Sequence, residues 1–230
     1  MIADAVVPAL DEAEAIGGVL DALPRNLLRR VVVCDNGSRD GTGEIARARG
    51  AVVVREERRG YGSACLAALA VMRRDPPDAV LFLDADGSDD PRDAESLLGP
   101  IAEGRADLVI GSRVLGRREP GALTPQARFG NWLATGLIGR FYGVPWTDLG
   151  PFRAVRWSAL EGLAMRDPDF GWTVEMQVKA ARAKLRSIEV PVSYRRRIGR
   201  SKISGTLTGA SRAGAKILGT IAVDLIRGGR

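Results

Sequence analysis

The 230-residue sequence contains no histidine, which excludes an imidazole acid, base or metal ligand from any site that it forms. Its only two cysteines, Cys34 and Cys65, lie in apolar stretches, so we expect no disulfide framework and a reducing, cytoplasmic setting. Aromatic residues make up 5% of the chain and no nucleic-acid recognition signature occurs, so no nucleic-acid partner is expected. No apolar run approaches the roughly 18 residues of a membrane span, and we expect neither a spanning helix nor a signal peptide.

The charged residues are distributed unevenly along the chain, whose net charge is +6. Residues 1–110 carry 13 basic and 20 acidic side chains, whereas residues 111–230 carry 21 basic and 8 acidic ones. An acidic half is suited to holding a cation, and a basic half to facing an anion. Two simpler interpretations stay open: a solvated surface of uneven charge, and a non-catalytic module that binds polyanions through its basic half.

Short β-branched runs alternate with helical patterns in the first half of the chain. The expected strands are Ala3–Val7, Val31–Asp35, Val52–Arg55, Ala79–Asp84 and Leu108–Ser112, and the expected helices lie near 12–22, 41–49, 62–74 and 91–103. Runs such as VVVCD and VLFLD are apolar at nearly every position, which is typical of strands buried on both faces of a parallel sheet. The alternation therefore predicts an α/β fold with a doubly wound, mostly parallel sheet flanked by helices.

The second half has a different pattern. A helix is expected over Pro125–Tyr142, where the residues spaced for one apolar face are Phe129, Trp132, Leu133, Leu137 and Phe141. The elements expected after it are a strand ending at Val155, a helix near 172–184, a strand over Ile188–Tyr194, a basic loop over 195–202 and a helical segment near 206–227. Neither an internal repeat nor a linker occurs, so we expect one domain with a C-terminal helical extension.

The tripeptide Asp84-Ala85-Asp86 stands at the end of a buried strand. In an extended chain its two carboxylates lie on the same side, and such oxygen ligands suit Mg²⁺ or Mn²⁺, especially when a diphosphate supplies further oxygens. The structural alternative is a polar strand end followed by an acidic turn that caps a helix beginning at Pro91. Ligands of open α/β sheets bind beyond the carboxyl ends of the strands, so the tripeptide is expected beside a ligand crevice.

The segment DNGSRDGT at 35–42 also follows a buried strand. There Asp35 or Asn36 is placed to accept a hydrogen bond from an N–H of a nucleotide base at the same edge of the sheet. The alternative is a tight turn followed by a helix that Asp40 or Thr42 caps.

Basic residues suited to a phosphate occur in two places. The loop with Arg196 and Lys202 also contains Gly199 and Ser201, a composition typical of a mobile loop that folds over a phosphate-bearing ligand. Arg113 follows a strand that ends in Gly-Ser, at the same edge as the acidic tripeptide. The alternatives are an exposed charge run for the loop and a salt bridge for Arg113.

Taken together and in order, these pieces resemble the family-2 glycosyltransferases of GT-A fold, a Rossmann-like α/β architecture. Within that family the sequence is most similar to the dolichyl- or polyprenyl-phosphate mannosyl- and glucosyltransferases. The matching stretches are VPALDEAE at 7–14, DNGSRDGT at 35–42, RGYGSA at 59–64, DADGSDDP at 84–91, GSR at 111–113, TDLGPFRA at 147–154 and GRSKISGT at 199–206. The ordered set spans almost the whole chain and is far more specific than any one motif.

The resemblance implies a role for each matching residue. The residues along the nucleotide base and ribose would be Pro8, Leu10 and Glu12, and those flanking the base would be Cys34 and Asn36. The residues that carry the ribose and a Mg²⁺ or Mn²⁺ ion would be Asp84, Ala85 and Asp86, with Asp86 as the direct ligand of the metal. The residues that neutralise the donor diphosphate and an acceptor phosphate would be Arg113, Arg196 and Lys202.

Two positions depart from the family pattern, namely Asn36, where an aspartate is usual, and Leu10, where a tyrosine is common. Both positions concern recognition of the base. The sequence therefore leaves GDP-mannose-type and UDP-glucose-type donors open, with a hexose as the transferred sugar in either case.

The implied reaction is direct displacement at the anomeric carbon of the sugar, with inversion. The metal and the basic loop would stabilise charge on the departing nucleoside diphosphate. A polyprenyl phosphate acceptor is already anionic and needs no strong base, whereas a soluble hydroxyl acceptor, the alternative, needs one. Because the chain has no histidine, the candidate bases are Asp148 and Glu175, and the alternative role of Glu175 is to pair with a neighbouring arginine.

The resemblance also divides the chain into a glycosyltransferase domain at 1–204 and a C-terminal helical segment at 205–230. Residues 1–113 would form its nucleotide-binding half and residues 114–204 its acceptor-binding half. Because basic residues stand among apolar ones in the C-terminal segment, it is suited either to lie on the inner face of a membrane without crossing it or to pack on the domain.

Overall fold

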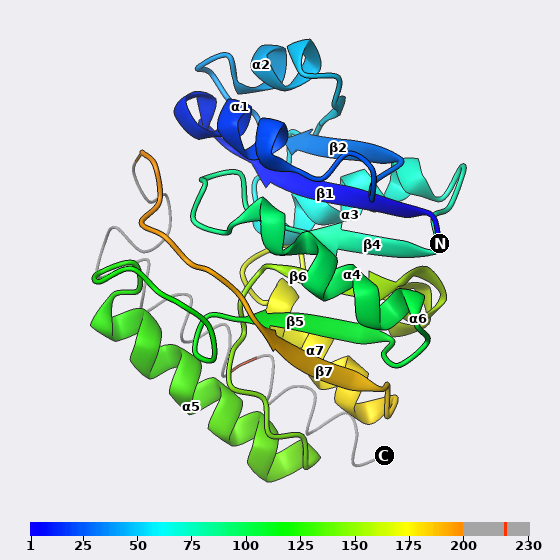
Figure 1. Ribbon diagram of the computed structural model, residues 1–230, viewed down its shortest axis with the longest axis vertical. Coiled ribbons are helices and arrows are strands. Elements are labelled where there is room, and N and C mark those ends of the chain that lie inside the picture. Colours follow the sequence, from blue (N-terminus) through cyan, green and yellow to red (C-terminus); the bar gives the residue numbers. More distant parts are fainter. Residues whose placement is uncertain (200–218, 220–230) are drawn as a thin grey trace.

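The computed structural model describes residues 1–199 and residue 219, and it contains a seven-stranded sheet (Figure 1). The strands are β1 (Ala3–Ala9), β2 (Arg30–Asp35), β3 (Val52–Arg55), β4 (Ala79–Phe82), β5 (Leu108–Ser112), β6 (Arg153–Arg156) and β7 (Ser187–Pro191). Their order across the sheet is β3-β2-β1-β4-β6-β5-β7. Strand β6 is antiparallel to β4 and β5, and the other neighbours pair in parallel. The predicted mostly parallel α/β sheet is confirmed.

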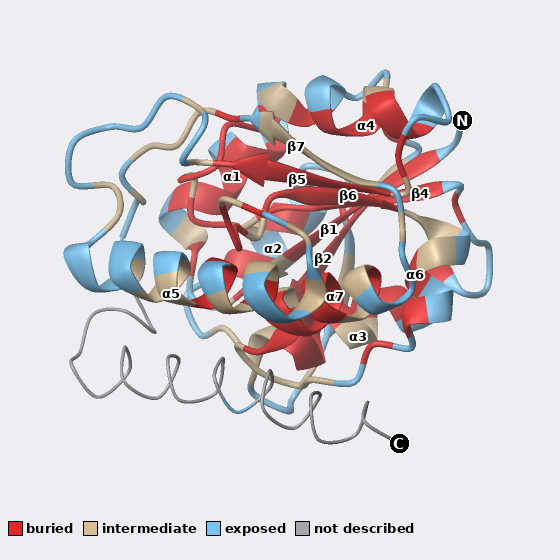
Figure 2. Cartoon of the chain, turned by 90° about the horizontal axis from the view of Figure 1, so that it is seen from below, coloured by how far each residue is buried: buried red, intermediate tan, exposed pale blue. Residues whose placement is uncertain are grey.

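Helices cover both faces of this sheet (Figure 2). They are α1 (Ala13–Ala22), α2 (Thr42–Ala48), α3 (Tyr61–Met72), α4 (Ala94–Ala102), α5 (Pro125–Tyr142), α6 (Trp157–Leu163) and α7 (Trp172–Arg182), with a 3-10 turn, η1 (Pro91–Asp93), before α4. One apolar cluster packs the sheet against α1, α2 and α4, and a second packs it against α3, α5, α6 and α7. Val33 lies in the first cluster and Val32 and Cys34 lie in the second, which explains the uninterrupted apolar run of β2.

The observed elements differ from the predicted ones mainly at their ends. Strand β4 stops at Phe82 instead of Asp84, after the backbone N–H of Leu83 donates to Val6. The next bond of this ladder would come from the N–H of Pro8, which proline lacks, so the chain leaves the sheet there. Strand β7 likewise ends before Tyr194, and helix α6 was not predicted.

Helix α5 has the predicted bounds, but its predicted apolar face packs only in part. Leu137 packs against the core beside the buried Ala134 and Ile138, whereas Phe129, Trp132 and Phe141 are exposed. Among the residues that the structure describes, no helix combines the length and apolar character that a bilayer crossing needs. Three sequence-based expectations lie outside the described residues: Lys202, the helical segment near 206–227 apart from residue 219, and the domain boundary after residue 204.

Candidate active site

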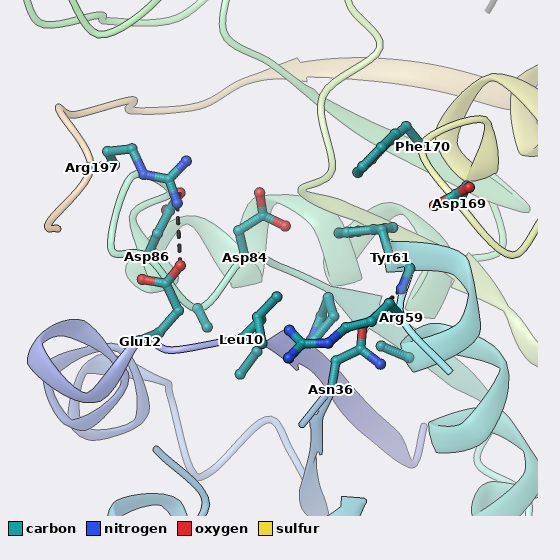
Figure 3. Close-up of a pocket in the computed structure, with 15 residues that line it drawn as sticks. Leu10, Glu12, Asn36, Arg59, Tyr61, Asp84, Asp86, Asp169, Phe170 and Arg197 are labelled. Carbon is teal, nitrogen blue, oxygen red and sulfur yellow. Dashed lines mark hydrogen bonds and ion pairs between the residues drawn. The ribbon is translucent and has the colours of Figure 1, made fainter. Parts of the chain in front are cut away.

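A cavity of about 260 Å³ opens at the edge of the sheet where β1, β2 and β4 end (Figure 3). Its lining residues are Pro8, Ala9, Leu10, Glu12, Asn36, Arg59, Gly60, Tyr61, Ala64, Asp84, Ala85, Asp86, Asp169, Phe170 and Arg197. Parallel strands deliver their carboxyl ends to one edge, which is why segments far apart in the sequence meet here. Of the residues expected to bind the nucleotide sugar, all except Cys34 and Asp35 line this cavity.

Asp84 and Asp86 form an acidic wall of the cavity. The Oδ1 atom of Asp86 accepts a hydrogen bond from the backbone N–H of Ser88 at 2.9 Å, and Oδ2 lies 3.1 Å from Nη2 of Arg197. The Oδ1 atom of Asp84 is buried and has no hydrogen-bond partner among the described residues. Burial, together with the charges of Asp86 and Asp89, raises the pKa of Asp84 well above its usual value. Such a wall favours a cation in front of it.

A third carboxylate, Asp89, is buried in the same turn. Its Oδ2 accepts a weak hydrogen bond from the backbone N–H of Asp84 at 3.4 Å, and its Oδ1 has no partner in the described chain. Burial raises the pKa of Asp89 to about 7, although the charge of Arg113 acts in the opposite direction. The acidic turn that the sequence suggested is therefore present, and it adds to the negative potential behind the cavity.

Arg197 brings positive charge into the cavity. Its Nη2 atom lies 3.2 Å from Oε1 of Glu12 and 3.1 Å from Oδ2 of Asp86, so one guanidinium bridges the segments that follow β1 and β4. The backbone beside it is also fixed, because the N–H of Ile198 donates to the carbonyl oxygen of Asp86 at 2.9 Å. The guanidinium thus partly neutralises the acidic wall.

The direction of successive side chains explains why Arg197, and not Arg196, lies in the cavity. Side chains of an extended chain alternate in direction. Arg196 donates through its backbone N–H to Oε2 of Glu119 and through Nε to the carbonyl oxygen of Pro120, away from the cavity lining. The structure therefore places Arg197 in the cavity lining, and it does not place Arg196 where the predicted phosphate contact would need it.

Asn36 lines the cavity, yet its side chain is bound to the backbone of a neighbouring segment. Its Nδ2 donates to the carbonyl oxygens of Glu56 at 2.9 Å and Arg58 at 2.8 Å, and its Oδ1 accepts from the N–H of Gly60 at 2.9 Å. These three bonds fix the segment that leads into α3. Asn36 therefore positions the backbone on both sides of Arg59.

Cys34 and Asp35 lie next to the cavity lining but are not part of it. The Cys34 side chain is fully buried in the cluster under α3, and burial raises the pKa of its thiol to about 12. The Oδ1 atom of Asp35 accepts from the N–H of Ser38 at 2.8 Å and shapes the turn after β2. Asp35 therefore stabilises the tight turn that was the alternative for this segment, and it is not placed for a contact with a base in the cavity.

The start of α3 lies in close contact with the segment 167–170. A Cβ atom on Gly60 or Gly62 would overlap a backbone carbonyl oxygen of that segment, and Gly60 also has a φ of +137°. Glycine is therefore required at both positions. Their close approach brings Asp169 and Phe170 into the cavity wall.

The substitution Gly62→Ala is expected to lower the free energy of unfolding by about 1–3 kcal/mol, because the added methyl group has no room. Denaturant unfolding of the purified protein measures this. The matched control is Gly18→Ala in α1, where no atom lies within 4 Å of the added Cβ, and a change of less than about 1 kcal/mol is expected. Equal losses in both variants would contradict the close contact.

Glu175, a candidate base, holds the segment before α7 and does not line the cavity. Its carboxylate accepts hydrogen bonds from the backbone N–H groups of Arg166 at 3.1 Å and Asp167 at 2.8 Å. It also pairs with Lys179, one helical turn further on, at 2.7 Å. Its charged partner is thus a lysine and not the arginine that the sequence suggested. Its hydrogen bonds to Arg166 and Asp167 hold the segment before α7 in place.

Arg113 and Asp148 form a buried ion pair outside the cavity lining. Two guanidinium nitrogens of Arg113 bind the two oxygens of Asp148, at 2.8 and 2.6 Å, and the guanidinium lies 5.0 Å from the ring centre of Tyr194. Burial acts to raise the pKa of Asp148, but the charge and hydrogen bonds of Arg113 hold it below its usual value. Arg113 therefore forms a salt bridge, which the sequence analysis gave as the alternative to a phosphate contact.

Comparison with known proteins identifies the family. Residues 4–162 match the family model described as "Glycosyl transferase family 2". The chain belongs to glycosyl transferase family 2. This glycosyltransferase is 39% identical over 208 residues to an uncharacterized glycosyltransferase of Mycobacterium tuberculosis, covering 89% of this chain and 91% of the relative. It is 32% identical over 223 residues to the undecaprenyl-phosphate mannosyltransferase of Micrococcus luteus, covering 89% and 88% of the two chains.

The fold of this family-2 glycosyltransferase is similar to that of a solved GT-A enzyme. The crystal structure is that of glucosyl-3-phosphoglycerate synthase from Mycobacterium tuberculosis in complex with Mn²⁺, uridine diphosphate and glucosyl-3-phosphoglycerate. The TM-score is 0.76 at 22% sequence identity, with 96% of this chain and 78% of that chain covered. The expected family and the expected GT-A fold are both confirmed.

Five charged or aromatic residues that line the cavity of this glycosyltransferase were not predicted: Arg59, Tyr61, Asp169, Phe170 and Arg197. For the first two a signal existed, because the stretch RGYGSA was already part of the family resemblance. The other three come from segments whose place at the cavity depends on contacts with distant parts of the chain.

Proposed function

We propose that this glycosyltransferase moves a hexose from a nucleotide-sugar donor, of GDP-mannose or UDP-glucose type, to a polyprenyl phosphate, with inversion at the anomeric carbon. The cavity carries the proposal, because it combines the carboxylates of Asp84 and Asp86 with the guanidinium groups of Arg59 and Arg197 at the ligand-binding edge of the sheet. Two comparisons support it: a relative named undecaprenyl-phosphate mannosyltransferase, and a solved enzyme of the same fold that holds uridine diphosphate and Mn²⁺.

In this proposal the nucleotide lies along the end of β1, where Pro8 and Leu10 line the cavity. Tyr61 and Phe170 add two aromatic rings to the wall, which suits the faces of a base or a sugar. The diphosphate would lie toward Arg197, beside the acidic wall. The cavity thus draws residues from both predicted halves of the domain.

Asp84 and Asp86 fit a bound Mg²⁺ or Mn²⁺ ion. The Oδ1 atom of Asp84 is a buried acceptor without a partner in the described chain, and a cation would satisfy it. Among residues 1–199 and 219, no group of three or more acidic or cysteine side chains is arranged so that it could hold a metal ion. The two carboxylates would therefore leave the remaining ligand positions to the diphosphate and water. A bound ion would supply positive charge to the departing nucleoside diphosphate.

Arg59 and Arg197 supply positive charge from the chain itself. A guanidinium stays protonated throughout the working pH range, and its fork of N–H donors suits phosphate oxygens. Because Arg197 already pairs with Glu12 and Asp86, it is held in the cavity before substrate arrives. We propose that it donates to the diphosphate as negative charge builds on the leaving group.

Neither of the two bases predicted for a hydroxyl acceptor, Asp148 and Glu175, is placed to serve one. A hydroxyl needs a group that takes its proton, whereas a phosphate is anionic at neutral pH. Glu175 is engaged with backbone N–H groups and Lys179, and Asp148 is buried against Arg113. Neither carboxylate lines the cavity, so neither is placed to serve a hydroxyl acceptor there. A lipid phosphate acceptor would hold the enzyme at the inner face of a membrane.

Product extraction tests this function. The full chain is incubated with Mn²⁺, undecaprenyl phosphate in detergent, and radiolabelled GDP-mannose or UDP-glucose. We expect one donor to transfer label into the butanol phase, in a product from which mild acid releases the sugar. The matched control is undecaprenol, which has the same chain with a hydroxyl group in place of the phosphate, and it should accept no label. Label that enters only water-soluble products would overturn the lipid acceptor and favour a soluble one.

A further inference from the structure

Helix α5 carries an exposed stripe of aromatic and basic residues, which we call the aromatic–basic stripe. Arg128, Trp132 and Arg140 follow one another at spacings of four and eight residues and lie on one exposed face of the helix, with Phe129 beside them. The exposed fractions are 67% for Trp132 and 61% for Phe129, and their ring centres lie 5.8 Å apart. Figure 2 shows this outer side of α5 as exposed and its inner side as buried.

The charge of α5 is of one sign. Its 18 residues include two arginines and no aspartate or glutamate. The loop before it adds Arg117 and Arg118, both exposed, and one acidic residue, Glu119, which accepts a hydrogen bond from the backbone N–H of Arg196. The aromatic pair is thus bracketed by cations on the helix and preceded by further cations, so the partner that complements this surface is anionic and offers an apolar layer for the rings.

A second copy of this chain does not meet that description. Antiparallel pairing of two such stripes about a two-fold axis would bring Arg128 of one copy near Arg140 of the other, and α5 has no carboxylate to separate them. An anionic lipid surface meets both requirements, because its headgroups attract arginines and its interfacial layer accepts Trp and Phe rings.

We propose that the aromatic–basic stripe docks this glycosyltransferase on an anionic lipid surface. The proposal rests on the proposed function, since it places the enzyme where a polyprenyl phosphate would be found. The geometry agrees: α5 begins on the side of the molecule to which β5 points, the same side as the cavity (Figure 1). The loop before α5 also touches the segment whose Arg197 lines the cavity, because Glu119 accepts a hydrogen bond from the backbone N–H of Arg196 at 2.8 Å.

Vesicle sedimentation with the full chain tests this docking. We expect binding to phosphatidylcholine vesicles that contain phosphatidylglycerol and much weaker binding to phosphatidylcholine alone. The double variant Phe129→Gln/Trp132→Gln should bind the anionic vesicles at least about tenfold more weakly, because two rings leave the interface. Each of Arg128→Gln and Arg140→Gln should weaken binding by about fivefold. The matched control is Ile2→Gln, an exposed apolar residue at the N-terminus, which should not change binding.

Two outcomes would overturn the docking surface: vesicle binding that the double variant leaves unchanged, or light scattering in which wild type is a dimer and the variant a monomer. A second assay separates this result from the proposed function, namely sugar transfer to a short-chain, water-soluble prenyl phosphate without vesicles. The double variant should keep the wild-type rate there, because the stripe does not line the cavity. If wild type glycosylates no prenyl phosphate but the vesicle difference persists, the acceptor proposal fails and the docking surface stands.

Discussion

The substitution Asp86→Asn is expected to lower kcat/KM for sugar transfer by at least about a hundredfold. Asparagine keeps an oxygen that accepts the Ser88 N–H, but it removes the negative charge that faces Arg197 and the proposed divalent ion. Initial rates with saturating acceptor and Mn²⁺ measure the loss. Titration of Mn²⁺ in the presence of the nucleoside diphosphate should show weaker metal binding as well, which ties the lost rate to the charge of this side chain.

The control for this variant is Asp21→Asn, which neutralises an exposed carboxylate of α1 that pairs with Arg49 outside the cavity lining. Its rate should stay within about twofold of wild type. The thermal midpoint of Asp86→Asn should remain within about 5 °C of wild type, because relief of repulsion from Asp84 and Asp89 offsets the lost pair with Arg197. A folded Asp86→Asn protein with full turnover and full metal affinity would remove Asp86 from the catalytic machinery.

The part of the fold that followed from the sequence is the part that local pattern determines. Runs such as VVVCD in β2 are apolar on both faces because two layers of helices cover the sheet, and this requirement is visible residue by residue. The early end of β4 was not visible in this way. It depends on Pro8, whose missing N–H matters only because β1 and β4 are neighbours. Strand pairing, and not local sequence, determines that boundary.

The same distinction separates the site residues that were anticipated from those that were not. Asp84 and Asp86 stand directly after a buried strand, so their place at the sheet edge follows from the chain around them, while their role as metal ligands stays a prediction. Phe170 reaches the cavity only because Gly60 and Gly62 allow a distant segment to approach α3. Such a contact has no local signature, although the two glycines mark where it occurs.

Whether Arg196 or Arg197 faces the cavity depends on the pairing register of their segment, which the sequence alone does not specify. The sequence predicts a basic loop beside the ligand, but in an extended chain only every second side chain points toward the cavity. Which set faces inward depends on how the segment pairs with residues 86–89, and the N–H of Ile198 bound to the carbonyl of Asp86 fixes that pairing in favour of Arg197. The cation that lines the cavity is therefore Arg197, one residue after the expected Arg196.

The variants Arg197→Ala and Arg196→Ala form a matched pair that tests this register. Arg197→Ala is expected to lower kcat for sugar transfer by about a hundredfold or more, because the leaving diphosphate loses a guanidinium that the cavity holds in place. Arg196→Ala should stay within about threefold of wild type, because its side chain binds the carbonyl oxygen of Pro120 instead of the ligand. Arg197→Lys, which keeps the charge but not the fork of donors, should recover part of the loss.

Metal affinity distinguishes this role of Arg197 from a merely structural one. In the protein without donor, Arg197 and a divalent ion compete for the same Asp86 oxygen, so Arg197→Ala should bind Mn²⁺ about tenfold more tightly while its turnover falls. A variant that was simply misfolded would lose metal affinity and turnover together. A larger loss in Arg196→Ala than in Arg197→Ala would show that the segment pairs in the other register when substrate binds. Tighter Mn²⁺ binding together with slower turnover is the result expected if Arg197 pairs with Asp86 in the free enzyme and donates to the leaving phosphate during transfer.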